Sequence, residues 1–459
     1  MPLPELMIAR PGTTIMDMAN AADGGRVPGP QPGAEGGPGP VTDETELEPA
    51  HLIAMSDAVT RIGALMLSAG TGSFRVRQSM RRAAAALGID RLQALVTLRD
   101  IVTTATWQGI FRTQVVEVPP PGVNAARLAE LEGLTLSIPK GTTVAELNAL
   151  LDAVEQRRLL YDSKRLVVAA GIACMAFAFL NNGGWAECAV VAVAAACGRL
   201  VQLVLANRKV NQLAVVLVAA ALACIVYVAV TAAIRDLDPG ASELHTSAFT
   251  SSLLFLVPGF PMMTAALDLA RSDLAAGIQR LTYASLIIFC AALGAWMVVA
   301  VTGVSPATAP VPAISLPLLD TLRLVTGFAG VLGFAVGFNT PWRFAVAAAC
   351  IGSVANTARL TATDHHMPQQ FAAIGATFIV GVASAVVARY ARCPRIIMSV
   401  PAILIMIPGA VAFRALVFLN DGEVTLALAN GVQAGLVVAS LAVGLAIARV
   451  VTDRGWALE

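Results

Sequence analysis

Two apolar stretches carry the same helix-breaking step: Leu256-Val257-Pro258-Gly259-Phe260-Pro261 and Met406-Ile407-Pro408-Gly409-Ala410. A proline inside a helix removes one backbone hydrogen bond and clashes with the carbonyl four residues earlier. The glycine that follows lets the backbone unwind at that point. Each stretch lies in the middle of an apolar run that is long enough to cross a membrane. We therefore expect two membrane helices, each broken near its centre.

The composition around these stretches is that of a membrane protein. Of the 459 residues, 57% are hydrophobic and 13% are charged, whereas an ordinary soluble domain has about 25% charged residues. The charged residues concentrate before residue 166, so a polar N-terminal third precedes a membrane domain. This pattern excludes a large soluble enzyme, a fibrous protein and a disulfide scaffold. The net charge of +1 gives no reason to expect nucleic acid as a partner.

The seven cysteines suggest neither a metal site nor a disulfide framework. None lies in the polar third, and no Cys-x-x-Cys or Cys/His spacing occurs. We expect the cysteines to act as small apolar residues within helices, and we expect no metal or cofactor.

From Leu166 onward, long apolar runs alternate with short polar breaks. Such runs must be helical in lipid, because a helix satisfies its own backbone hydrogen bonds. We count ten candidate membrane helices, at 166–182, 185–206, 212–234, 247–268, 279–302, 319–338, 342–359, 370–391, 395–418 and 425–450. A proline-rich, uncharged connection separates the fifth from the sixth and divides the helices five and five.

The basic residues orient these helices. With the N-terminus inside, most lysines and arginines lie at inner ends, and the outer ends carry only Arg235, Arg323, Arg359 and Arg414. The positive-inside rule then places both termini in the cytoplasm. Since five is odd, the two halves cross the membrane in opposite directions. The fold class we expect is a polytopic α-helical protein of the plasma (inner) membrane, with two inverted five-helix repeats.

The polar third divides into a tail and a small domain. Residues 1–49 are rich in proline and glycine, which predicts disorder. Residues 50–164 predict a cytosolic α+β domain with a three-stranded antiparallel meander. In it, Gly70 and Gly72 end the first helix, and Ser73 is placed to be the N-cap of the second. The remaining expected boundaries are 165–302 and 319–451 for the membrane repeats, 303–318 for an extracytoplasmic linker and 452–459 for a cytosolic tail.

Paired interrupted helices at matching positions of two halves indicate a transporter site near the membrane midplane. Freed carbonyls can hold an ammonium group, and half-helix N-termini can hold a carboxylate. A zwitterionic amino acid needs both. The candidate substrate-binding residues are therefore Pro258, Gly259, Pro408 and Gly409. The alternative is that each Pro-Gly step is only a packing kink.

Other polar residues in the membrane domain are further candidates. Arg414 could bind a substrate carboxylate bidentately, or its side chain could reach the outer interface. Asn356 could line a polar path, or it could form interhelical hydrogen bonds. Asp268 and Asp273 are candidates for proton coupling, because burial could raise the pKa of a carboxyl at a membrane edge. The alternative is a solvated turn in which either aspartate pairs with Arg271.

The chain resembles the threonine/serine exporter (ThrE) family. The resemblance rests on four stretches: Ser68-Ala69-Gly70-Thr71-Gly72-Ser73-Phe74-Arg75-Val76 with Met80-Arg81-Arg82 and Leu87-Gly88; Val257-Pro258-Gly259-Phe260-Pro261 with Asp268 and Asp273; Phe338-Asn339-Thr340-Pro341-Trp342-Arg343; and Pro394, Pro401, Ile407-Pro408-Gly409 and Arg414. It implies a soluble domain fused to ten membrane helices, and proton-driven export of small hydroxy amino acids. Related systems split into two chains are associated with dicarboxylate export.

These observations favour a secondary exporter of threonine or serine that is not an enzyme. Its partners would be the small-molecule substrate, protons and the lipid bilayer. The N-terminal domain would gate the cytoplasmic mouth or mediate assembly, which leaves a homo-oligomer open. One alternative is an exporter of dicarboxylates such as succinate. Another is a membrane-anchored enzyme or sensor acting through the cytosolic domain, whose only histidine is His51.

Replacing both Pro258 and Pro408 with alanine should abolish transport and leave membrane insertion intact. The reason is that alanine restores the helical hydrogen bond that proline removes and closes the unwound segment. Transport in proteoliposomes and extraction from membranes measure the two properties. Full transport by the double variant would show that the two steps are kinks without a role in binding.

Overall fold

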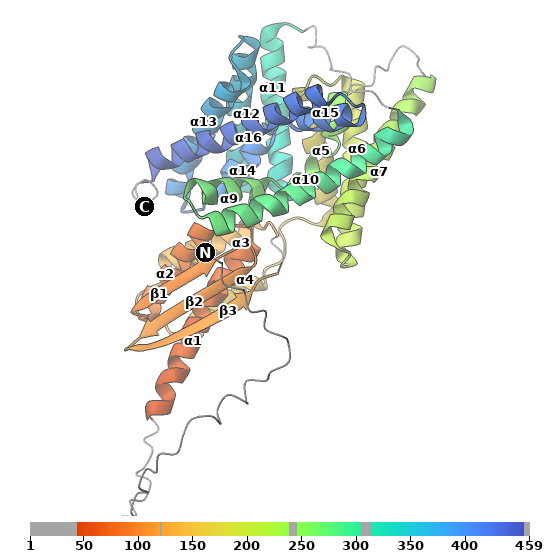
Figure 1. The fold of residues 1–459 in the computed structure, drawn as a ribbon. Helices are drawn as coiled ribbons and strands as arrows, with labels where there is room; N and C mark the ends of the chain where they lie inside the picture. Colours follow the sequence, from red (N-terminus) through yellow and green to blue (C-terminus); the bar gives the residue numbers. More distant parts are fainter. Residues whose placement is uncertain (1–43, 120–121, 238–245, 304–313, 454–459) are drawn as a thin grey trace, which may run out of the picture. The chain divides into compact units, whose positions relative to one another are not determined.

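The computed structural model describes residues 44–119, 122–237, 246–303 and 314–453 (Figure 1). Most of the tail that we expect to be disordered lies outside these residues, as do residues 454–459. Helix α1 (Glu44–Ser68) already begins before the expected domain boundary at residue 50.

A small α+β domain follows the order that the sequence predicts. Its antiparallel sheet has the strand order β1-β2-β3, with Arg91 opposite Thr106 and Asp100 opposite Glu117. The elements after α1 are α2 (Ser73–Leu87), β1 (Arg91–Val96), β2 (Asp100–Trp107), β3 (Ile110–Glu117), α3 (Ala125–Ser137) and α4 (Val144–Glu155). Thr143 and Glu146 form a capping box that starts α4.

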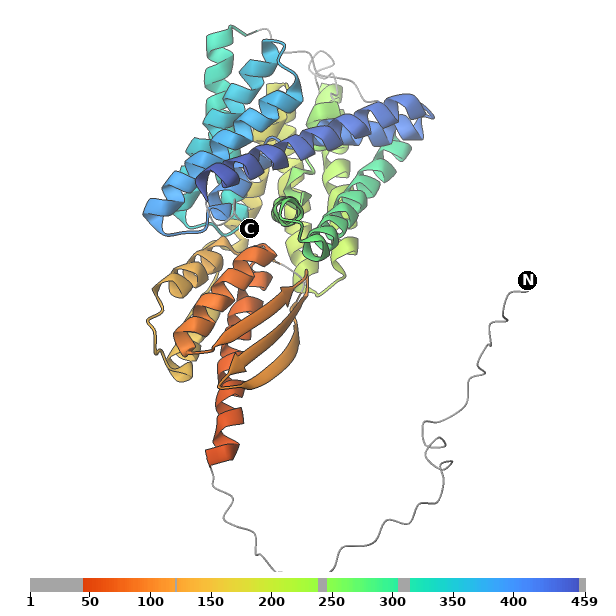
Figure 2. The same cartoon turned by 60° about the vertical axis from the view of Figure 1, so that its left-hand side comes forward.

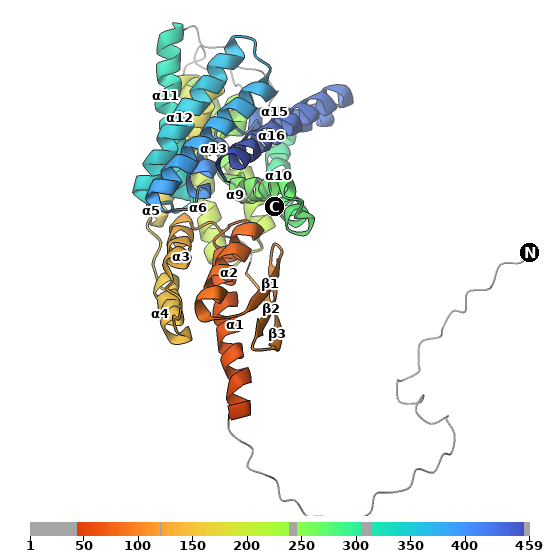
Figure 3. The same ribbon diagram turned by 90° about the vertical axis from the view of Figure 1, so that its left-hand side faces the viewer.

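Helices α1 and α2 lie between the sheet and the α3–α4 pair (Figure 3). On the sheet side, the hydroxyls of Thr60 and Thr103 are 3.2 Å apart. On the other side, Arg61 of α1 forms an ion pair with Asp152 of α4. The apolar side chains between these layers are fully buried, so they form the core of the domain.

Long apolar helices make up the rest of the chain. Among the described residues, nine helices are long and apolar enough to cross a membrane, or up to eleven if each of two bent pairs is one span. The chain is therefore a multi-pass membrane protein. The long helices after α4 are α5 (Ser163–Leu180), α6 (Trp185–Asn207), α7 (Gln212–Leu237), α10 (Leu274–Thr302), α11 (Leu316–Gly337), α12 (Trp342–Asp364), α13 (Gln369–Ala391) and α16 (Val424–Thr452).

The ninth long helix is part of α1, whose residues Ala50–Ser68 pass the same test of length and hydropathy. Its contacts are those of a domain helix, because it pairs with Thr103 of the sheet and Asp152 of α4. Hydropathy alone thus does not separate this buried helix from a membrane span.

The two bent pairs are the helices that the Pro-Gly steps interrupt. In the first, α8 (Thr246–Ser251) and the 3-10 turn η1 (Leu254–Leu256) precede α9 (Gly259–Ala270), with a bend of 73°. In the second, α14 (Ile396–Leu404) precedes α15 (Gly409–Asn420), with a bend of 54°. The expected breaks are therefore present at both sites.

The two series of helices pack in the same order. In the first series, α5 packs on α6, α6 on α7, α7 on α10, and α10 on α9. In the second, α11 packs on α12, α12 on α13, α13 on α16, and α16 on α15. Figure 2 shows α10 in green and α16 in blue, the long helices that follow the two breaks.

Helices α5 and α11 join the two series through a close backbone contact. A Cβ added at Gly333 would lie 2.6 Å from the carbonyl oxygen of Ala169. Glycine at this position therefore lets the two helices approach, as small residues commonly do in membrane interfaces.

Candidate functional site

The two breaks have the same backbone geometry. Pro258 has φ −79° and ψ 64°, and Pro408 has φ −79° and ψ 58°. These are the angles of an inverse γ-turn. The turn is closed at each site by a hydrogen bond of 2.8 Å, from Gly259 N–H to the Val257 carbonyl and from Gly409 N–H to the Ile407 carbonyl. Both prolines thus end one helix and start the next in a single defined conformation.

Several backbone groups near each proline stay hydrogen-bonded in spite of the bend. Before the turns, Val257 N–H donates to Leu254 and Ile407 N–H donates to Leu404. After the turns, the carbonyl of each proline accepts the first bond of the new helix. Such local bonds are needed in apolar surroundings, where an unpaired backbone group costs several kcal/mol.

The breaks lie against each other and against an apolar cavity of about 310 Å³. A Cβ at Gly259 would lie 2.7 Å from Cδ1 of Leu404, so glycine allows α9 to contact the end of α14. Val257, Pro408 and Gly409 line the cavity together with Phe177 and other apolar side chains. Among the predicted binding residues, Pro408 and Gly409 therefore face a cavity directly.

Pro408 also borders a second cavity of about 310 Å³, whose wall is polar. Arg414 lines it from α15, and Arg359 and Arg323 line it from α12 and α11. Arg323 forms an ion pair with Asp364, with 2.5 Å between Nη1 and Oδ2. Within the part of the chain that the structure describes, Arg359 and Arg414 have no carboxylate partner. This cavity can therefore receive a carboxylate between two guanidinium groups.

Asn356 does not line either cavity. Its side chain is fully buried in α12, and its Oδ1 accepts a hydrogen bond of 3.1 Å from Nε of Arg359. Asn356 is thus a positioning residue for Arg359. From the sequence, Arg359 is only an outer basic residue. Its spacing of three from Asn356 nevertheless places both residues on one helix face.

Asp268 lies at the opposite end of α9, where α2 of the α+β domain begins. Its carboxylate is 3% exposed and accepts from the backbone N–H and the hydroxyl of Ser73. Nε of Arg280 lies 3.4 Å from Oδ2 of Asp268. The N-cap of α2 is Gly72 and has no side-chain cap, so Asp268 of α9 supplies the acceptor that Ser73 was expected to supply. The expectation of Ser73 as the N-cap is wrong, because its hydroxyl is turned to the two aspartates instead.

Asp273 completes this junction from the start of α10. Its Oδ2 accepts from the hydroxyl of Ser73 at 2.6 Å and from Arg77 at 2.7 Å. Its Oδ1 caps α10 by accepting from Ala276 N–H. Burial acts to raise the pKa of Asp273, but the bonds from Ser73 and Arg77 outweigh it and lower the pKa below its usual value.

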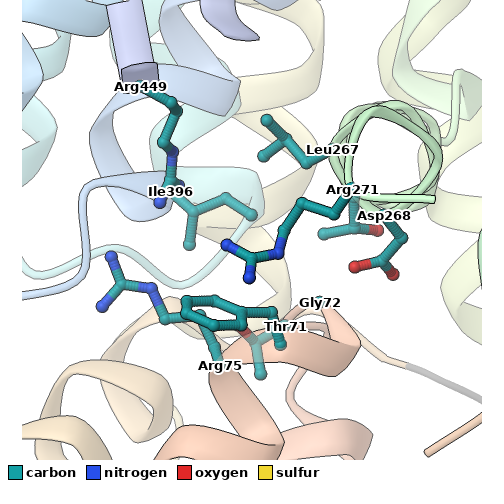
Figure 4. A pocket seen from close by; sticks show the side chains of 10 residues that line it. Thr71, Gly72, Arg75, Leu267, Asp268, Arg271, Ile396 and Arg449 are labelled. Carbon is teal, nitrogen blue, oxygen red and sulfur yellow. The ribbon is translucent and has the colours of Figure 1, made fainter. Parts of the chain in front are cut away.

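Neither Asp268 nor Asp273 forms an ion pair with Arg271, so the alternative of a solvated turn with such a pair is not what the structure has. The guanidinium of Arg271 lies 3.7 Å from the ring centre of Phe74 in a cation–π contact. Figure 4 shows Arg271 and Asp268 beside a cavity of about 30 Å³, with Arg75 and Arg449 reaching the same cavity. None of its lining residues borders the polar cavity at Pro408, so the two groups of predicted residues form two separate sites.

A second junction holds the α+β domain to the other series of helices. The N-terminal N–H groups of Ala125 and Ala126 donate to the carbonyls of Phe338 and Asn339. The Asn339 side chain donates to the Asn124 side chain, the N-cap of α3. The domain therefore contacts α9 through α2 and the α11–α12 turn through α3.

Many apolar spans, two broken helices and a charged cavity beside one break define a membrane transport protein. Two family models described as threonine/serine exporter (ThrE) match residues 57–302 and residues 323–451. The chain belongs to the threonine/serine exporter family.

Individual relatives carry two different substrate names. The chain is 24% identical to "Threonine/serine exporter" of Corynebacterium glutamicum over 91% of this chain and 86% of the relative. It is 29% identical to "Probable succinate transporter subunit YjjP" of Klebsiella aerogenes, over 54% of this chain and 95% of the relative. The same subunit of Escherichia coli is 28% identical over the same shares. No solved structure matches the chain.

The junction at Asp273 should stabilise the protein only while its carboxyl is ionised. The pKa of Asp273 is lowered on folding. Its contribution to the free energy of unfolding is therefore fully present above the ordinary carboxyl pKa, and it is lost as pH falls through the pKa that Asp273 has in the folded protein. The wild type should exceed Asp273→Asn in thermal stability at pH 7, and this advantage should shrink below about pH 4. Melting temperatures of the purified proteins between pH 3 and pH 7 measure it.

Glu117→Gln is the matched control, because it removes an exposed ion pair with Arg99. Exposed pairs contribute about 0.2–1 kcal/mol, so this variant should melt close to the wild type. An Asp273→Asn protein that is as stable as the wild type at pH 7 would contradict the prediction.

Proposed function

We propose that this protein is a proton-driven secondary exporter of threonine and serine across the plasma membrane, with both termini in the cytoplasm. The observation that carries the proposal is the pair of matching inverse γ-turns at Pro258 and Pro408. The second turn borders a polar cavity with two arginines that have no carboxylate partner among the described residues. Membership of the exporter family supports the same class of function.

The proposed topology has ten spans in two inverted five-helix repeats. It counts each bent pair as one span and assigns α1 to the cytosolic domain. The repeats are 165–302 and 319–451, with the linker 303–318 outside, and the matching order of helix packing supports them. Alternating access would then move one repeat against the other around the two turns.

The proposed substrate site lies at the Pro408 turn, between the apolar and the polar cavity. Arg414 and Arg359 bind the substrate carboxylate through their planar guanidinium groups. Asn356 holds Arg359 in place. The shared wall of Phe177, Ile407 and Pro408 gives the small side chain an apolar surface. Pro258 and Gly259 act from the other side by holding α9 against Leu404.

The proposed proton carrier is Asp268. Ser73 has one hydroxyl proton, yet its oxygen lies 3.1 Å from Oδ1 of Asp268 and 2.6 Å from Oδ2 of Asp273. Only one carboxylate can receive that proton at a time. A proton on Asp268 would let its carboxyl donate to Ser73 while Ser73 donates to Asp273. Protonation would thus change how α2 holds α9, which couples the proton to the broken helix.

A dicarboxylate such as succinate is the second candidate substrate. Two arginines in one cavity, neither with a carboxylate partner in the described ranges, can bind two carboxylates as readily as one. The relatives named as succinate transporter subunits are consistent with this possibility. The two candidates differ in the ammonium group of the amino acid, for which the cavity lining offers Asp364, a carboxylate that is paired with Arg323.

Substrate exchange in proteoliposomes tests the proposal. Labelled threonine and serine should exchange, and an imposed pH gradient should accelerate their net transport. Arg414→Gln should raise the KM at least tenfold, because a charge-assisted bidentate contact is worth about 1.5–3 kcal/mol. Arg235→Gln is the matched control, since Arg235 is exposed at the end of α7 and lines neither cavity.

Each result has a defined meaning. If succinate exchanges and neither threonine nor serine does, the substrate class is dicarboxylates and not amino acids. If none of the three compounds moves, the exporter proposal is wrong. A wild-type KM in Arg414→Gln would remove Arg414 from the substrate site.

Asp268→Asn should separate exchange from proton coupling. The amide keeps the shape of the carboxyl but cannot carry the proton, so counterflow should continue while the pH gradient loses its effect. Counterflow and gradient-driven transport in the same proteoliposomes measure the two. An Asp268→Asn protein that responds to the gradient as the wild type does would exclude Asp268 as the proton carrier.

A further inference from the structure

A basic cavity lies where the α+β domain meets the ends of three membrane-domain helices. Its volume is about 620 Å³, and its lining comes from α2, α3, α13, α14 and α16. Five arginines line it: Arg75 and Arg82 from α2, Arg389 and Arg392 from the end of α13, and Arg395 from the start of α14. We call it the basic basin.

The basin holds more positive charge than its acids can balance. Glu132 forms an ion pair with Arg75, and Asp453 lies 3.7 Å from Nη2 of Arg395. These are the two acidic residues of the lining. Within the described ranges, the guanidinium groups of Arg82, Arg389 and Arg392 form no hydrogen bond or ion pair. Three guanidinium groups are therefore available to an anion in one cavity.

A buried arginine behind the basin adds a fourth positive group. Arg449 of α16 is only 6% exposed, and in the part of the chain described here its guanidinium group has no hydrogen bond or ion pair. It points into the small cavity of Figure 4, which shares Arg75 with the basin. A charge that is buried without a partner costs several kcal/mol. An anion held beside Arg75 would lower this cost.

The rim of the basin is apolar and exposed. Val386 of α13 is 51% exposed, Val451 of α16 is 67% exposed, and Leu136 of α3 is 51% exposed. The first two lie on helices that are long and apolar enough to span a membrane. A basic floor beside an apolar rim at a membrane edge fits a ligand with a charged head and an acyl chain.

We propose that the basic basin binds a phosphate-bearing anion, and that the headgroup of an anionic phospholipid is its main source. The ligand contacts α2 on one side and α13, α14 and α16 on the other. It therefore clamps α2, the same helix whose first residues bind Asp268 and Asp273. The site does not depend on which substrate the protein exports.

Lipid binding to the full-length protein tests the proposal. Native mass spectrometry and thermal unfolding are measured in nanodiscs of phosphatidylcholine, with and without phosphatidylglycerol. The wild type should retain phosphatidylglycerol and melt higher in its presence. The triple variant R82Q/R389Q/R392Q should bind this lipid at least tenfold more weakly. The control R81Q/R158Q/R208Q removes three arginines outside the basin lining and should change binding less than twofold.

Arg392→Gly tests the site without disturbing the fold. Arg392 has φ 49° and ψ 47°, a left-handed conformation that glycine adopts without strain. The variant should therefore melt as the wild type does in phosphatidylcholine alone, and it should bind phosphatidylglycerol several-fold more weakly. Equal lipid binding by this variant, the triple variant and the wild type would overturn the proposal.

Soluble anions separate the two sources of phosphate. If inorganic phosphate or ATP stabilises the wild type in neutral nanodiscs and phosphatidylglycerol does not, the source is a free phosphate compound. If phosphatidylglycerol alone stabilises it, the source is the lipid. Equal stabilisation by succinate, which has no phosphate, would overturn the assignment to phosphate if it is lost in the triple variant R82Q/R389Q/R392Q and so arises in the basin. So would equal binding of phosphatidylglycerol and phosphatidylcholine.

Discussion

A helix that stops in apolar surroundings must still satisfy the backbone groups at its two new ends, and the membrane domain depends on how this is done. At Pro258 and Pro408, an inverse γ-turn closes the gap with one short bond, and the proline carbonyl starts the next helix. The chain can then bend by 73° and 54° while several backbone groups at both turns stay hydrogen-bonded. The bend at Pro408 opens the polar and apolar cavities on its two sides.

The α+β domain is part of this arrangement, because Ser73 at the start of α2 donates hydrogen bonds to Asp268 of α9. Asp268 lies at the N-terminus of α2, where the N–H of Ser73 and the positive end of the helix favour a carboxylate. Through α3, the same domain binds the turn between α11 and α12. One domain thus contacts both series of helices.

The arginines divide into groups with different tasks. Arg359 and Arg414 face the cavity at Pro408 without a carboxylate partner in the described ranges, and this arrangement fits a substrate that enters and leaves. Arg280 is buried beside Asp268 and has a structural role, since it also binds the Thr71 carbonyl. The arginines of the basic basin lie at the ends of helices that are long and apolar enough to cross a membrane, and the proposed headgroup would stay in place there. These residues are all arginines, so their different roles depend on how deeply each guanidinium group is buried and on which carboxylate lies nearest to it.

Sequence alone determined the helices, the meander and the two breaks, because hydrophobic periodicity and the Pro-Gly steps act over a few neighbouring residues. It also selected Arg414 and Asp268 as residues to test. Only the tertiary structure decided that Asn356 holds Arg359, that Asp268 replaces Ser73 as the cap of α2, and that the arginines of α2 and α13 share one basin. These contacts join residues far apart in the chain, and the energy of a buried charge depends on the partner that folding brings to it.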